Sequence, residues 1–177
     1  ALTLDWSGRA ELKTLRSAEW RGAFRLLGGR ALICGFYLNE LLLKLLHRDD
    51  AHDALFDAYA HTLQALHHTG SSAELAAVLR GFEKRLLGEL GYALNLDHDA
   101  ATLQPLQGQS RYCYVPDRGP VALAQAPHGS AGGLELLGQT LIDMKLDNYA
   151  SPVTQQQSKS LMRLLIAHCL GQQTLHS

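Results

Sequence analysis

The 177-residue chain has little cysteine, and its three cysteines, Cys34, Cys113 and Cys169, show no paired spacing. Their scarcity argues against a disulfide framework and fits a reducing, cytosolic setting. The formal net charge is only −1, so charge alone indicates no nucleic-acid partner. Long hydrophobic runs are also absent. The most apolar stretch, residues 31–46, is too short and too often interrupted by polar side chains to span a bilayer, so no membrane partner is expected.

The motifs of the common enzyme classes are missing as well. The sequence contains no P-loop, no G-x-S-x-G nucleophile elbow and no G-x-G-x-x-G after a predicted strand. Nine histidines are present, but none forms the His-x-x-x-His pair of a zinc hydrolase. The adjacent His67 and His68 point in different directions on a helix. We therefore predict a protein that is not an enzyme, with no catalytic residue, no cofactor and no metal ligand.

The composition that remains is that of a globular domain. Apolar residues make up 46% of the chain and charged residues 19%, which is too apolar for disorder. The charge is unevenly distributed. Residues 1–30 carry six basic and three acidic side chains, whereas the other 147 residues carry ten basic and fourteen acidic ones. A basic head on an acidic body suggests two regions with different partners, although chance over a short window explains it equally well.

The N-terminal residues predict a β-hairpin. Residues 2–6 and 11–15 largely alternate apolar and polar side chains, and Ser7-Gly8-Arg9 between them has turn chemistry. Two strands alone are marginally stable in water, so this hairpin needs a larger sheet. Because Ala1 is not an initiator methionine, we expect the rest of that sheet in a preceding part of a longer protein.

Helical periodicity begins near residue 28. Residues 31–47 are apolar on nearly every side, which predicts a buried central helix. A second helix is predicted over residues 51–67, where apolar residues form one stripe. The spacing of Thr154 and Gln157 resembles a capping box and predicts that the last helix starts there.

A third helix is predicted between the second and the last. Ser71 and Glu74 have the spacing of a capping box, so the helix should open there and run to about Leu90. Gly81 and Gly88 lie seven residues apart on one face. Each costs about 1 kcal/mol relative to alanine in a helix, and a close approach of another helix is the simplest compensation.

The helical pattern breaks over residues 92–129. Residues 111–115 and 121–124 flank the turn-forming residues 116–120, which predicts a small β-hairpin inserted among the helices. A short helix is predicted over residues 129–138. The expected fold is mainly α, a helical bundle with a small β-hairpin insertion.

Basic residues cluster on the third helix. Arg80 and Lys84 are i, i+4 neighbours and lie beside Leu79. A basic rim beside apolar side chains is suited to an acidic, apolar peptide, because arginine binds a carboxylate through two hydrogen bonds. A solvated helix face with its aliphatic stems packed down is the alternative on spacing alone.

Several segments, in the same order, resemble the bacterial recombination mediator family RecO. They are residues 8–19, 35–42, 79–83 and 86–92. The resemblance implies an OB-fold barrel, of which residues 1–20 are the last strands. It also implies a helical domain over residues 21–177 with a zinc-finger-like insertion at about residues 92–129. Such proteins bind single- and double-stranded DNA, anneal strands and act with RecR to load RecA onto DNA coated by single-strand-binding protein, whose acidic C-terminal tail they also bind.

The resemblance also implies roles for particular residues. Arg80 falls where the family receives the tail of single-strand-binding protein, and Leu79 and Lys84, its neighbours by helical spacing, are predicted to bind the tail with it. Arg9, Lys13 and Arg16 would lie on the barrel edge, where phosphate contacts are plausible, and Trp6 is the local candidate for stacking on a base.

The sequence departs from the family at two places. Residues 96–99 contain no cysteine where many relatives have the start of a four-cysteine zinc site, so no zinc is expected. Residues 170–177 lack the lysines that relatives have there, which puts DNA contact by this tail in doubt. A helical protein-interaction scaffold without DNA binding of its own is the alternative function.

Overall fold

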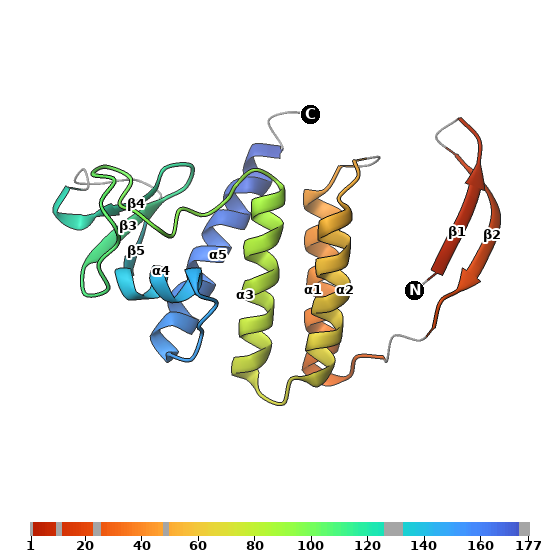
Figure 1. Cartoon of the computed structure of the whole chain (residues 1–177), viewed down its shortest axis with the longest axis horizontal. Coiled ribbons are helices and arrows are strands. Elements are labelled where there is room, and N and C mark those ends of the chain that lie inside the picture. The colour runs from red at the N-terminus through yellow and green to blue at the C-terminus, as the bar shows by residue number, and fades with distance from the viewer. Residues whose placement is uncertain (1, 10–11, 23–25, 48–49, 126–132, 174–177) are drawn as a thin grey trace.

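The computed structural model describes residues 2–9, 12–22, 26–47, 50–125 and 133–173. A β-hairpin stands at one end, a helical bundle occupies the centre, and a small sheet lies at the other end (Figure 1). Within these residues, no helix is both long and apolar enough to cross a membrane. The helices are α1 (Gly29–Leu45), α2 (Asp53–His68), α3 (Ser72–Glu89), α4 (Gly138–Lys145) and α5 (Pro152–Gln173). The strands are β1 (Leu2–Ser7), β2 (Thr14–Trp20), β3 (Arg111–Val115), β4 (Gly119–Ala122) and β5 (Leu134–Leu137), and a 3₁₀ turn covers Leu123–Gln125.

The predicted capping box of the third helix is confirmed. The Ser71 hydroxyl accepts a hydrogen bond from the backbone N–H of Glu74, and the Glu74 carboxylate accepts one from the N–H of Ser71. The helix ends where predicted, and Gly91 follows it with a φ of +85° that suits glycine. The prediction of a close helix approach at Gly81 and Gly88 was wrong, because a methyl group added at either position would meet nothing within 4 Å.

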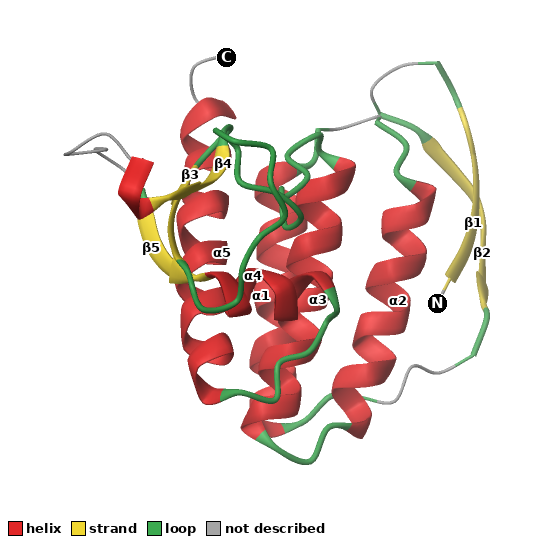
Figure 2. Ribbon diagram, turned by 60° about the vertical axis from the view of Figure 1, so that its left-hand side comes forward, coloured by secondary structure: helices red, strands yellow, loops and turns green. Residues whose placement is uncertain are grey.

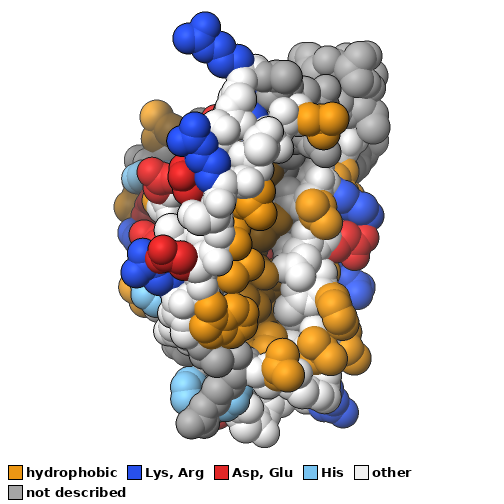
Figure 3. Space-filling model, turned by 90° about the vertical axis from the view of Figure 1, so that its right-hand side faces the viewer, with side chains coloured by type: hydrophobic (Ala, Val, Ile, Leu, Met, Phe, Trp, Pro, Cys, Tyr) orange, Lys and Arg blue, Asp and Glu red, His pale blue; other side chains and the backbone are white. Residues whose placement is uncertain are grey.

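Helix α1 is not buried on every side. Its buried residues are Gly35, Leu38, Leu41 and Leu45, which pack into the bundle core. Ile33, Phe36 and Leu43 are 68%, 63% and 84% exposed. Helix α1 contacts α2, α3 and α5, so the part of the prediction that was wrong is burial on every side, since these neighbours leave one face of α1 exposed. Figure 3 shows a band of hydrophobic side chains along a hollow on the side of the molecule where the β1–β2 hairpin lies.

The inserted sheet has one strand more than the predicted hairpin. Strands β3 and β4 pair antiparallel around the predicted turn, and β5 pairs antiparallel with the other edge of β3. The prediction of a helix over residues 129–138 was wrong for the described part of this range. Residues 134–137 form β5, and helix α4 begins only at Gly138. Residues 129–132 lie outside the described ones. Figure 2 shows this sheet packed beside α5.

The last helix starts two residues before the predicted cap. Helix α5 begins at Pro152, whose fixed φ suits the first helical position, and the N–H of Gln155 donates to the carbonyl of Ser151 at 3.0 Å. The Thr154 hydroxyl instead donates to the Asp143 carboxylate of α4 at 2.6 Å. This side chain therefore joins two helices and does not cap its own.

The N-terminal hairpin forms as predicted, but its second strand starts at Thr14 and continues to Trp20. Leu2 lies opposite Trp20 and Trp6 lies opposite Leu15, and all four side chains are more than half exposed. Figures 1 and 2 both show the hairpin standing apart from the helices. The barrel that would cover this apolar face stays a prediction.

Candidate functional site

A cavity of about 320 Å³ lies between α1, α3 and the start of α5. Three bases line it, Arg30 from α1, Arg80 from α3 and Lys159 from α5, and no acidic side chain of the described residues does. The apolar part of the wall consists of Ile33, Leu75, Ala76, Ala77, Leu79 and Tyr149. We call this hollow the basic cavity. An apolar hollow rimmed by cations suits an acidic ligand that also has an apolar group.

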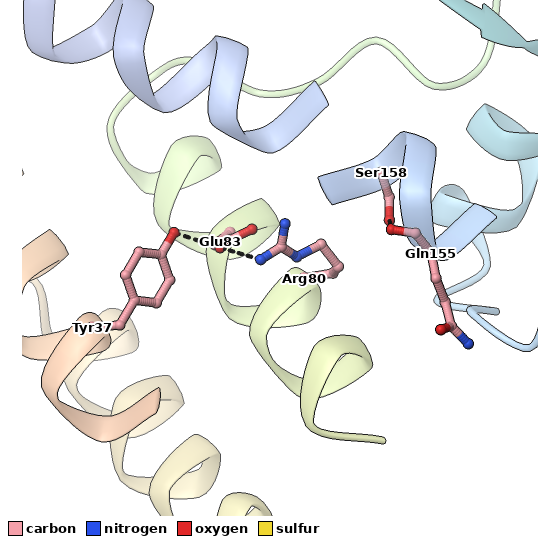
Figure 4. Close-up of polar contacts among 5 residues, drawn as sticks. All are labelled: Tyr37, Arg80, Glu83, Gln155 and Ser158. Atoms are coloured by element: carbon pink, nitrogen blue, oxygen red, sulfur yellow. Dashed lines mark hydrogen bonds and ion pairs between the residues drawn. The ribbon is translucent and has the colours of Figure 1, made fainter. Parts of the chain in front are cut away.

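Arg80 is the buried base of the three. Its side chain is 9% exposed, and its Nη2 donates to Oε1 of the fully buried Glu83 at 2.7 Å. The Tyr37 hydroxyl of α1 donates to the same oxygen at 2.7 Å, so Glu83 joins two helices (Figure 4). Among the described residues, neither Nε of Arg80 nor Oε2 of Glu83 has a hydrogen-bond partner. The ion pair is internal, but it adjoins the cavity.

Burial shifts the protonation of the groups around this ion pair. It raises the pKa of Glu83, and the nearby Arg80 guanidinium opposes that rise. Burial also raises the pKa of Tyr37, and the Glu83 carboxylate raises it further, so the hydroxyl stays protonated and donates. The pKa of Tyr149 is raised by burial too, and its buried hydroxyl has no partner among the described residues.

The structure brings together only part of the residues predicted for peptide binding. Leu79 and Arg80 both line the basic cavity, but Lys84 does not. The Lys84 ammonium donates to the carbonyl of Met144 at 2.8 Å and to the carboxylate of Asp147 at 2.5 Å. Lys84 therefore lines a separate hollow between α2 and α3, and its role in peptide binding stays a prediction.

Sequence reasoning missed the other two bases of the cavity. Arg30 precedes Arg80 by 50 residues and Lys159 follows it by 79. No helical spacing joins residues so far apart, and only the packing of α1 and α5 against α3 places them together. Arg30 also donates to the Ser72 hydroxyl, which ties the N-terminal ends of α1 and α3 to each other.

The predicted DNA-binding residues lie on the N-terminal hairpin. Arg9 and Lys13 belong to the connection between β1 and β2, and Arg16 lies at the register shift of β2. All three are exposed, and no acidic side chain of the described part of the chain pairs with them. Trp6 is 56% exposed on β1. Their charges are therefore open to solvent.

The stretch around residues 96–99, where no zinc was expected, has structural roles. Asp99 is buried and accepts hydrogen bonds from the backbone N–H groups of Ala101, Thr102 and Ala122. Asp97 pairs with Lys145 of α4. Within the described ranges, no group of three or more histidine, cysteine, aspartate or glutamate side chains is placed to hold a metal ion.

Comparisons with known proteins identify one family. The family model described as "Recombination protein O C terminal" matches residues 27–176. The chain belongs to the RecO family. "DNA repair protein RecO" of Nitrosospira multiformis is 48% identical over 177 residues, which cover 99% of this chain and 71% of that protein. The protein of the same name from Aromatoleum aromaticum is also 48% identical, over 99% of this chain and 71% of its own length.

The comparisons confirm the resemblance that the sequence motifs indicated. A third relative, "DNA repair protein RecO" of Ralstonia nicotianae, is 45% identical over 96% of this chain and 60% of its own length. The chain is thus a member of a DNA repair and recombination family, and it forms a mainly α domain with small antiparallel sheets. RecO relatives are longer than this chain.

Proposed function

We propose that this RecO domain is a binding module, not an enzyme, and that the basic cavity binds the acidic C-terminal tail of single-strand-binding protein. The cavity combines three cations with an apolar wall, and no acidic residue lines it in the part of the chain that the structure describes. A tail that ends in an apolar residue, a carboxylate and nearby acidic side chains matches both parts. Arg80 would receive the carboxylate and Leu79 the apolar group. Arg30 and Lys159 would supply the further positive charge that was expected from Lys84.

The test of the tail site uses Lys159, because Lys159 is exposed whereas Arg80 belongs to a buried ion pair. Fluorescence anisotropy would follow a labelled acidic peptide with an apolar last residue. Lys159→Ala should weaken binding by about two- to fivefold, the range of a solvent-exposed charge pair, and added salt should weaken the wild-type complex. Lys44→Ala, an exposed lysine of α1 outside the cavity, is the matched control. Equal binding by both variants and wild type would refute the site.

We propose further that the N-terminal hairpin belongs to an OB-fold barrel and contacts DNA. The exposed charges of Arg9, Lys13 and Arg16 support phosphate contacts, and the exposed Trp6 supports stacking on a base. With RecR, the protein would then help load RecA onto DNA coated by single-strand-binding protein and would anneal complementary strands.

Salt dependence tests the DNA contacts. Replacing Arg9, Lys13 and Arg16 with alanine should reduce the slope of log affinity against log salt by about 2 for single-stranded DNA, since each phosphate contact contributes about 0.7. Lys44→Ala should leave the slope unchanged. If wild type does not bind DNA even at low salt but does bind the acidic peptide, the alternative function, a protein-interaction scaffold, is the correct one. The acidic body of the chain favours that alternative.

A further inference from the structure

The Arg80–Glu83 pair is only half formed. One hydrogen bond joins Nη2 to Oε1 at 2.7 Å. The adjacent donor, Nε of Arg80, and the adjacent acceptor, Oε2 of Glu83, are both buried and have no partner among the described residues. An arginine and a carboxylate ordinarily pair through two parallel hydrogen bonds. The second bond of this pair is therefore missing although both of its atoms are available.

Tyr37 accounts for the missing bond. Its hydroxyl donates to Oε1, the oxygen that Arg80 also uses, at 2.7 Å. Tyr37 comes from α1 whereas Glu83 and Arg80 come from α3 (Figure 4), so the carboxylate is held from a second helix. A carboxylate held in this way is not free to turn its second oxygen toward Nε.

The single hydrogen bond between Arg80 and Glu83 affects how much of the Arg80 charge is available to a ligand in the basic cavity. Glu83 is the acidic neighbour of this guanidinium and itself lies outside the cavity lining. A two-bond pair would direct the guanidinium to Glu83 and leave less of its charge and fewer of its donors for a ligand. A one-bond pair keeps Arg80 in place, yet leaves its buried Nε without a hydrogen-bond partner among the described residues.

We infer that Glu83 is an internal competitor for Arg80, and that Tyr37 is the positioning residue that limits this competition and keeps Arg80 available to the carboxylate of a ligand. This inference rests on the proposed tail site and names the residues that set its affinity for a terminal carboxylate. The ligand class is an acidic peptide with a free C-terminal carboxylate.

Two acidic peptides that differ only in their last group, a free carboxylate or an amide, provide the test by fluorescence anisotropy. Tyr37→Phe removes the hydroxyl and leaves every charge in place. It should weaken the affinity for the carboxylate-ended peptide three- to tenfold and change the affinity for the amide-ended peptide less than twofold. A general loss of structure would instead weaken the binding of both peptides. Tyr59→Phe, which removes the hydroxyl that donates to Asn39 at 2.5 Å outside the cavity, is the matched control.

The variant Glu83→Gln shows whether Glu83 competes with the ligand for Arg80 or only holds Arg80 in place. In the Tyr37→Phe background it should restore the affinity for the carboxylate-ended peptide, because a neutral amide cannot form the charged two-bond pair. Alone, it should bind that peptide at least as tightly as wild type, and this variant remains informative if Tyr37→Phe does not fold. Unchanged binding by Tyr37→Phe, or weaker binding by Glu83→Gln, would overturn the inference while the tail site stands. A wild-type protein that binds neither peptide would overturn the tail site itself.

Discussion

Removing the charge of Arg80 should destabilise the fold as well as the site. Glu83 is fully buried, and Arg80 is the cation that pairs with it. Arg80→Met keeps much of the aliphatic volume but leaves the carboxylate with the Tyr37 hydroxyl as its only hydrogen-bond donor among the described residues. Breaking a buried ion pair in this way costs about 3–5 kcal/mol, and the remaining hydrogen bond to Tyr37 places the expected loss near the lower end, about 3 kcal/mol.

The loss should depend on pH. The pKa of Glu83 is already raised by burial, and Arg80 is the main group that lowers it. Without Arg80 the folded-state pKa rises further above the unfolded value. A carboxyl with a raised pKa contributes most to stability below its unfolded pKa, and this contribution is lost as pH rises through the folded pKa. The deficit of Arg80→Met should therefore be smaller at pH 5 than at pH 8.

Urea unfolding at these two pH values measures the effect. The double variant Arg80→Met/Glu83→Gln should recover most of the loss, because it removes the unpaired charge. Arg85→Met, an exposed arginine of the same helix, should change the free energy of unfolding by less than about 0.5 kcal/mol. The reasoning is refuted if Arg80→Met lies within 1 kcal/mol of wild type at pH 8, or if the double variant is as unstable as the single one.

Three further substitutions test the fold outside the cavity. Burial by itself raises the pKa of Asp99, but hydrogen bonds from three backbone N–H groups lower this pKa below its usual value. The Asp99 carboxylate therefore stabilises the fold at pH values above its unfolded pKa. This contribution is lost as pH falls through the folded pKa. Asp99→Asn should cost about 2 kcal/mol at pH 7 and progressively less below pH 4, as urea unfolding will show. Gly138→Ala should prevent stable folding, as circular dichroism on heating would show, because the added methyl would lie 2.0 Å from the Gln107 carbonyl oxygen; a melting temperature equal to that of wild type contradicts this. Gly88→Ala has open space around it and should raise the free energy of unfolding by about 0.5–1 kcal/mol; a loss of stability would show that the space is needed.

Two predictions that rest on neighbouring residues were confirmed. The capping box at Ser71 and the turn between β3 and β4 depend on the chemistry of four or five consecutive residues. Helix α1 and the last helix were found within a few residues of their true ends. The burial of α1 was not predicted correctly. This helix is apolar on nearly every side but has one exposed face, since apolar composition does not specify which face receives a neighbour.

The errors occurred where a distant contact overrides a local signal. Thr154 has the spacing of a helix cap, yet its hydroxyl is taken by Asp143 of α4. Residues 134–137 pair with β3, a strand more than 20 positions earlier in the chain, and so become a strand where a helix was predicted. Lys84 was grouped with Arg80 by helical spacing, but its ammonium binds Asp147 and the Met144 carbonyl, and it lines a different hollow.

The sequence by itself determined the family, helices α1, α2, α3 and α5, the two hairpins, and two residues of the proposed site, Leu79 and Arg80. These follow from motifs and from spacings within one element. Tertiary structure alone decided that Arg30 and Lys159 join them, and that Tyr37 and Glu83 restrain the central arginine. The physical reason is that charges and hydrogen bonds act over a few ångströms. Residues tens of positions apart therefore reach one another only after apolar burial has packed α1, α3 and α5 together.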